Sequence, residues 1–144
     1  QFVVTTGAAY QFKLPIWGLI MRRWGAIPIE RSNIRQAYRS LQTAKDVLLN
    51  GSSVQILPEG KRTLDGKLGK FKNGPFHLAI DAKVPIIPIG IKGAYEIKKR
   101  TDWRFRPGRV TATIGDPIHP QEYADMSAKE LSLYARDIIQ KMIK

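Results

Sequence analysis

The spacing of apolar residues along the chain predicts four helices. They cover residues 14–24, 33–49, 75–82 and the C-terminal segment. In the second of these, apolar residues recur at helical intervals from Ile34 to Leu48, and Asn50-Gly51 can end the helix. The C-terminal helix opens with the capping box Ser127-x-x-Glu130, in which two side chains satisfy free N–H groups of the first turn.

Short apolar or alternating runs predict five strands. They lie at residues 2–5, 26–29, 53–57, 86–91 and 109–115. Pro88 lies inside the fourth run, so that strand is expected at a sheet edge or with a bulge. Because strands alternate with helices, we expect an α/β fold with a mostly parallel or mixed sheet flanked by helices. The length of 144 residues fits one core, so residues 1–144 are expected to form a single domain.

The charge balance indicates an anionic partner. The chain has 24 Lys and Arg residues against 12 Asp and Glu residues, a formal net charge of +12. The absence of cysteine excludes disulfides, thiolate catalysis and cysteine-bound metal. No apolar run approaches the roughly 20 residues that a transmembrane helix needs, so none of this segment is expected to cross a membrane.

The densest positive charge follows the third predicted strand, in the segment ILPEGKRTLDGKLGKFKNG at residues 56–74. A second strand ends in the same way, at Glu30-Arg31. Ligands of parallel sheets bind beyond the carboxyl ends of strands, so we expect Arg31 and Arg62 to end adjacent strands and face one cavity. Their guanidinium forks suit phosphate oxygens. The alternative is a solvated turn without a ligand, and the GxxxxGK[ST] spacing of a P-loop is absent.

Groups for acid–base or metal chemistry are scarce. His77 lies in a predicted helix with Asp81 four positions later, which favours a surface or partly buried pair over a catalytic role. His119 lies in the turn sequence GDPIHP and is expected to be structural. Together with Asp116 it offers too few ligands for a metal, so no metal site is expected.

Several segments together resemble the glycerolipid acyltransferases, most closely the 1-acylglycerol-3-phosphate (lysophosphatidic acid) acyltransferases. They are GAIPIERSN, LPEGKRT, GKFKNGPFHLA, VPIIPIGI and RPGRVTATIGDPI, in the family's order over nearly the whole chain. Lys61 stands where threonine is usual in the family. The family's HxxxxD block is missing, since Ala82 lies five positions after His77 and Ala124 five positions after His119. The resemblance implies that this block lies upstream of Gln1, so the chain is expected to be an acyltransferase domain that lacks its N-terminal portion.

The resemblance implies transfer of an acyl group from an acyl thioester to the free hydroxyl of lysophosphatidate or a related glycerophosphate. The donor would be acyl-coenzyme A or acyl carrier protein, a co-substrate, and no cofactor or metal is implied. The acceptor phosphate would be held by Arg31 and by the Glu59, Gly60, Lys61 and Arg62 segment, with Thr63 and Lys72 as further candidates. Without the HxxxxD block no catalytic residue lies in this chain, and the chain alone is expected to be inactive.

Lipid substrates imply an anionic membrane surface as partner, at the cytoplasmic face. The candidate contacts are the helix 14–24 and the basic, aromatic segment 98–109. The alternatives are a buried helix for 14–24 and a solvated charged loop for 98–109. A non-catalytic membrane-binding relative is one alternative, and an HxxxxD block would distinguish it from an enzyme. A nucleic-acid-binding module is another, favoured by the net charge and by KKRTDWRFRPGR. No RNP, KH or helix-turn-helix pattern supports it, so no nucleic acid is expected as partner.

Overall fold

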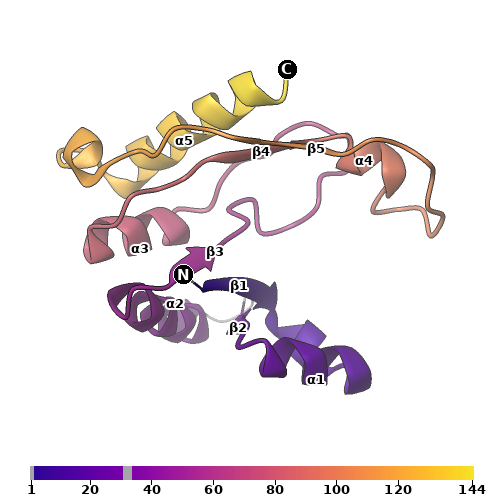
Figure 1. Ribbon diagram of the computed structural model, residues 1–144, viewed down its shortest axis with the longest axis horizontal. Helices are drawn as coiled ribbons and strands as arrows, with labels where there is room; N and C mark the ends of the chain where they lie inside the picture. Colours follow the sequence, from indigo (N-terminus) through magenta and orange to yellow (C-terminus); the bar gives the residue numbers. More distant parts are fainter. Residues whose placement is uncertain (1, 31–33) are drawn as a thin grey trace. The chain divides into compact units, whose positions relative to one another are not determined.

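The computed structural model describes residues 2–30 and 34–144, and it divides the chain into two compact units (Figure 1). The first unit is Gln1–Leu57 and the second is Pro58–Lys144. Each unit holds one of the two sheets, a three-stranded sheet in the first and a two-stranded sheet in the second.

The first unit is built on a parallel sheet with strand order β2-β1-β3. These strands are β1 (Val3–Ala8), β2 (Ile27–Ile29) and β3 (Ser53–Gln55). Thr6 lies opposite Ile27 and Val3 opposite Ser53, so β1 pairs with both neighbours. The expectation that the strands before Arg31 and Arg62 are adjacent is therefore wrong. Strand β1 lies between β2 and β3, so the connection from β2 to β3 passes over β1.

The helices of the first unit are α1 (Pro15–Arg23) and α2 (Ile34–Leu49), preceded by the short 3-10 helix η1 (Ala9–Lys13). Phe12, Met21 and Ala26 form a small buried cluster. Gly18 lets α1 approach η1 closely, because a Cβ there would lie 2.3 Å from the Phe12 carbonyl oxygen. The Arg22 side chain donates to the same carbonyl at 2.7 Å. One face of α1 is thus tied to η1, and the remaining positions, Gly18 and Met21 excepted, are exposed or partly exposed.

The second unit contains an antiparallel strand pair and three helices. Its elements are α3 (Gly74–Ala82), β4 (Ile89–Lys92), α4 (Ala94–Ile97), β5 (Thr111–Ile114), the 3-10 helix η2 (Pro120–Tyr123) and α5 (Ala128–Met142). Ile89 lies opposite Ile114, and a further bridge joins Ile86 and Ile118. Helix α5 packs on α3 and β4 (Figure 1).

Leu131 of α5 lies at the centre of the core of the second unit, with none of its surface exposed. The core also contains Phe76, Ile118, Tyr123, Ala128 and Ala135. The Tyr123 hydroxyl lies 2.7 Å from the Val84 carbonyl oxygen and 3.2 Å from that of Ala79, so this buried polar group is satisfied. Burial raises the pKa of the Tyr123 phenol.

The predicted α/β class and all four predicted helices are confirmed. The capping box is confirmed as well: the Ser127 N–H donates to Glu130 Oε2 at 2.8 Å, and the Glu130 N–H donates to Ser127 Oγ at 3.3 Å. Strand β4 begins after Pro88, later than predicted, because proline has no N–H to pair. The short helices η1, α4 and η2 were not predicted. Among the described residues, none of the helices has the length and apolar character needed to span a bilayer.

Candidate phosphate-binding site

The candidate site is the basic loop, residues 58–72, at the start of the second unit. Its two ends are held together because the Lys72 N–H donates to the Pro58 carbonyl at 2.8 Å. Gly60 has φ +68°, a left-handed conformation that side chains disfavour, so glycine is required for the turn at the start of the loop. Closure at the base turns a glycine-rich and lysine-rich segment into a defined loop.

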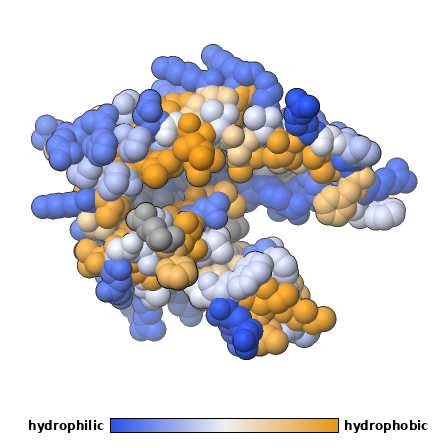
Figure 2. Space-filling view, viewed as in Figure 1, coloured by the Kyte–Doolittle hydropathy of each residue, from blue (hydrophilic) through white to orange (hydrophobic). Residues whose placement is uncertain are grey.

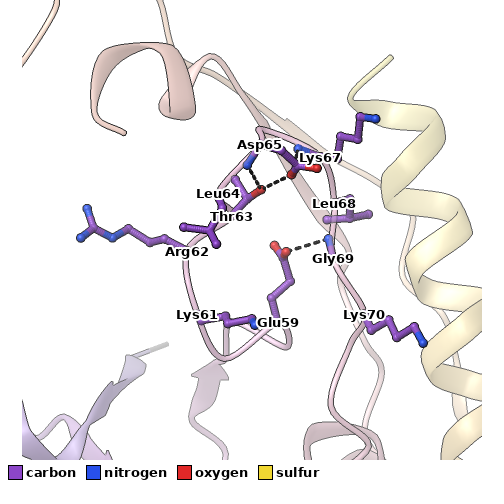
Figure 3. A pocket seen from close by; sticks show the side chains of 10 residues that line it. All are labelled: Glu59, Lys61, Arg62, Thr63, Leu64, Asp65, Lys67, Leu68, Gly69 and Lys70. Atoms are coloured by element: carbon purple, nitrogen blue, oxygen red, sulfur yellow. Dashed lines mark hydrogen bonds between the residues drawn. The ribbon is translucent and has the colours of Figure 1, made fainter. Parts of the chain in front are cut away.

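The basic loop surrounds a hollow of about 440 Å³ (Figure 3). Four cationic side chains line it, Lys61, Arg62, Lys67 and Lys70, together with the two carboxylates of Glu59 and Asp65. Its remaining lining residues are Thr63, Leu64, Leu68 and Gly69. Within the described ranges 2–30 and 34–144, none of the four cationic side chains has a hydrogen-bond or ion-pair partner. Their positive charge is therefore available to an anion.

Both carboxylates in the hollow are engaged by the loop itself. Asp65 Oδ1 accepts from the Thr63 hydroxyl at 2.9 Å and from the Lys67 N–H at 3.1 Å. These donors, the Lys67 N–H first, lower the pKa of the Asp65 carboxyl. Glu59 Oε2 accepts from the Gly69 N–H at 2.8 Å across the loop. The two acids thus organise the backbone of the loop.

The side chains of the hollow point in different directions. Figure 3 shows the Glu59 carboxylate directed across the loop toward Gly69, whereas the Arg62 guanidinium extends outward from it. The predicted candidate Thr63 is committed to the loop, because its Oγ1 accepts from the N–H groups of Asp65 at 3.3 Å and Gly66 at 3.1 Å. Of the other predicted residues, Lys61 lines the hollow, and Lys72 lies beside Gly60 at its base, with Cγ 3.8 Å from where a Gly60 Cβ would stand.

Arg31 lies outside the described residues, so its meeting with Arg62 stays a prediction. His77 and Asp81 are both exposed on α3, and no ion pair joins them in the described part of the chain. Their exposure agrees with the predicted surface position of these two residues. His119 is the N-cap residue of η2, and its N–H donates to Glu122 Oε1 at 2.7 Å. Among the residues that the structure describes, no three acidic, histidine or cysteine side chains gather as a metal site would require.

Two residues outside the predicted set contact the basic loop. Arg136 of α5 donates from Nε to the Gly69 carbonyl and from Nη2 to the Leu68 carbonyl, both at 2.9 Å. Tyr95 of α4 donates to the Leu64 carbonyl at 2.9 Å. The sequence carries no signal for either contact, since the partners are 31 to 68 residues apart.

Comparison with known proteins places the chain in a family. The acyltransferase family model matches residues 2–92, which is more than half of the chain. The chain therefore belongs to the acyltransferase family, and the resemblance that its motifs predicted is confirmed.

The similar proteins are named for one activity. The chloroplastic 1-acyl-sn-glycerol-3-phosphate acyltransferase LPAT1 of Arabidopsis thaliana is 34% identical over 90% of this chain and 36% of its own length. The 1-acyl-sn-glycerol-3-phosphate acyltransferase of Haemophilus influenzae is 30% identical over 97% of this chain and 58% of its own length. The crystal structure of the 1-acyl-sn-glycerophosphate acyltransferase PlsC from Thermotoga maritima matches with a TM-score of 0.80 at 27% identity, over 96% of this chain and 54% of that one. The chain thus spans between 36% and 58% of the length of these three proteins.

Proposed function

We propose that this chain is the acceptor-binding part of an enzyme that acylates the free hydroxyl of lysophosphatidate or a related glycerophosphate. The acyl donor is a thioester of coenzyme A or acyl carrier protein. The observation that carries the proposal is a set of four cationic side chains on a closed loop within the family match, for which the described part of the chain supplies no hydrogen-bond or ion-pair partner. The names of the relatives support the substrate class.

The phosphate is bound by side chains of the basic loop. The N–H groups of Asp65, Gly66 and Lys67 already donate to oxygens of Thr63 and Asp65, so they are not free to form an anion-binding nest. Arg62 offers a planar fork for two phosphate oxygens, and Lys61 adds a point charge. From its outward position, the Arg62 side chain turns to meet the ligand. Arg31 and Lys72 are proposed as further phosphate ligands. Glu59, Gly60 and Thr63 are proposed to shape the loop.

Binding the phosphate contributes orientation to the reaction. It fixes the acceptor hydroxyl relative to the group that removes its proton, and in the family that group is the histidine of HxxxxD. The hydroxyl oxygen then attacks the thioester carbonyl and the thiol leaves. Because the thioester is itself an activated acyl donor, the proposal needs no cofactor or metal. The motif is absent from the 144 residues, so this chain supplies acceptor binding alone.

Substitution of Arg62 tests the phosphate site. We expect Arg62→Ala to weaken binding of glycerol 3-phosphate about 10- to 100-fold, since hydrogen bonds to charged groups contribute about 1.5–3 kcal/mol. Arg62→Lys should recover only part of this loss, because lysine keeps the charge and lacks the fork. Isothermal titration at two salt concentrations measures both effects.

Arg39→Ala is the matched control for that experiment. Arg39 is exposed on α2, and its removal changes the net charge by the same amount outside the basic loop. If Arg62→Ala binds glycerol 3-phosphate as tightly as Arg39→Ala does, the proposed site is refuted.

We propose further that the protein works at an anionic membrane surface on the cytoplasmic side. Helix α1 exposes Ile16 (77%), Leu19 (61%) and, just beyond its end, Trp24 (69%), and Figure 2 shows hydrophobic residues gathered on α1 beside hydrophilic ones. The segment 98–109 exposes Trp103 (82%) and Phe105 (76%) among six basic residues. Exposed aromatic and basic side chains suit the headgroup region of a bilayer. The nucleic-acid alternative is based on the same segment, and we do not adopt it because no RNP, KH or helix-turn-helix pattern accompanies the segment.

Vesicle binding tests the membrane proposal. The chain should co-sediment more strongly with vesicles that contain phosphatidylglycerol than with pure phosphatidylcholine vesicles. Each basic residue near an anionic surface contributes about 1 kcal/mol, so Arg100→Ala should weaken this binding about fivefold. Lys129→Ala on α5 removes an equal charge from another exposed position and should have a smaller effect. Equal binding to neutral and anionic vesicles would contradict the electrostatic part.

A further inference from the structure

We infer that Tyr95 and Arg136 are positioning residues of the phosphate site: they touch no ligand but hold the backbone of the basic loop in the shape that binds phosphate. The inference rests on the proposed function of that loop. It adds two residues from outside the loop, on α4 and α5, that none of the motifs includes.

Gly69 is held on both sides. Its N–H donates to Glu59 Oε2 at 2.8 Å, and its carbonyl accepts from Arg136 Nε at 2.9 Å. The second arm of the Arg136 fork reaches the preceding carbonyl, that of Leu68, also at 2.9 Å. One rigid guanidinium thus binds two consecutive peptide carbonyls, a geometry that the flexible ammonium of lysine does not match.

Tyr95 holds the opposite part of the loop. Its hydroxyl donates to the Leu64 carbonyl at 2.9 Å, and its ring lies against Gly66. A Cβ on Gly66 would stand 2.9 Å from the Tyr95 ring, and the φ of Gly66 is +81°, so the residue is glycine for both steric and conformational reasons. Lys99 lies over the same ring, with Nζ 5.4 Å from its centroid.

These contacts matter for binding because a loop of this composition costs free energy to order. It contains several glycines and lysines, whose ordering costs about 1–2 kcal/mol of backbone entropy per residue. A loop that is already held before the ligand arrives avoids that cost at the moment of binding. The two anchors hold the segment 64–69, which carries Lys67. Arg62 lies two residues before this segment and Lys70 directly after it, so both are attached to backbone that the anchors hold.

Two conservative substitutions separate positioning from charge. Tyr95→Phe removes one hydrogen bond and keeps the ring, and Arg136→Lys keeps the charge and loses the fork. Each should weaken binding of glycerol 3-phosphate and of inorganic phosphate about 2- to 10-fold, the range set by one net hydrogen bond. Hydrogen exchange of the Gly69 amide should accelerate in Arg136→Lys, since local opening of the loop becomes easier.

Three control variants decide what a loss of affinity means. Tyr134→Phe on α5 and Arg39→Lys on α2 repeat the chemical changes at exposed positions. Tyr123→Phe lowers the stability of the second unit by removing a buried hydroxyl outside the basic loop. All titrations are run at a temperature where each variant is fully folded. The inference predicts that the three controls bind phosphate as the unchanged chain does.

The outcomes are distinguishable. Weaker binding in both Tyr95→Phe and Arg136→Lys, with unchanged controls, supports the inference. Unchanged binding in both, while Arg62→Ala loses affinity, overturns the inference and leaves the proposed function standing. An equal loss in Tyr123→Phe also overturns it, because the effect then reports stability alone. If Arg62→Ala has no effect, the phosphate site itself is refuted.

Discussion

The 144-residue chain is expected to bind glycerol phosphates without transferring an acyl group. An alcohol hydroxyl is a poor nucleophile near pH 7, and a positioned general base typically contributes about 10²- to 10⁴-fold to the rate. Neither histidine of the chain has an aspartate five positions later. A thioester-cleavage assay with lysophosphatidate and acyl-coenzyme A should therefore show no turnover above the background reaction.

His77→Ala is the informative variant for this prediction. His77 is exposed on α3, and His119 is the N-cap residue of η2. Turnover by the unchanged chain that disappears in His77→Ala would show that His77 is the base, contrary to the expectation. Phosphate binding should persist in His77→Ala, because the basic loop retains all its cationic side chains.

Leu131→Ala is expected to be among the most destabilising single substitutions in the second unit. Leu131 is fully buried, and the core residues of α3, η2 and α5 pack around it. Removing its side chain loses burial and leaves a cavity, at a cost of about 2–5 kcal/mol in the free energy of unfolding. Urea unfolding, followed through amide hydrogen exchange in residues 58–144, measures this cost for the second unit.

Leu133→Ala is the matched control on the same helix. Leu133 is 55% exposed, so the same change in side chain removes little buried surface and should alter the free energy of unfolding by less than about 1 kcal/mol. Similar losses for the two variants would show that α5 is not packed as the structure describes.

Most of the helices and the capping box could be predicted because their signals are local. In α5, Ser127 and Glu130 exchange hydrogen bonds over three residues, and the spacing of apolar residues indicates which face is buried. The short helices η1, α4 and η2 have too few residues to show a period, and they were missed. Pro88 correctly indicated an irregularity in the fourth predicted strand, since β4 begins only after it.

The order of the strands depended on tertiary structure. The short apolar runs at β1, β2 and β3 all fit buried parallel strands, and nothing in their composition specifies which is central. The structure places β1 in the middle, paired on one side through Thr6 and on the other through Val3. Pairing is set by how each connection packs on the sheet, which is not a property of any strand alone.

The candidate site divides in the same way. The sequence by itself determined where the positive charge and the glycines of the basic loop lie, because both follow from residue type alone. Only the tertiary structure decided that Glu59 holds the Gly69 N–H, and that Tyr95 and Arg136 hold the carbonyls of the loop. Such contacts join groups 10 to 68 residues apart. They form only when packing of the helices brings those groups within hydrogen-bond distance. The spacing of the residues along the chain does not predict this.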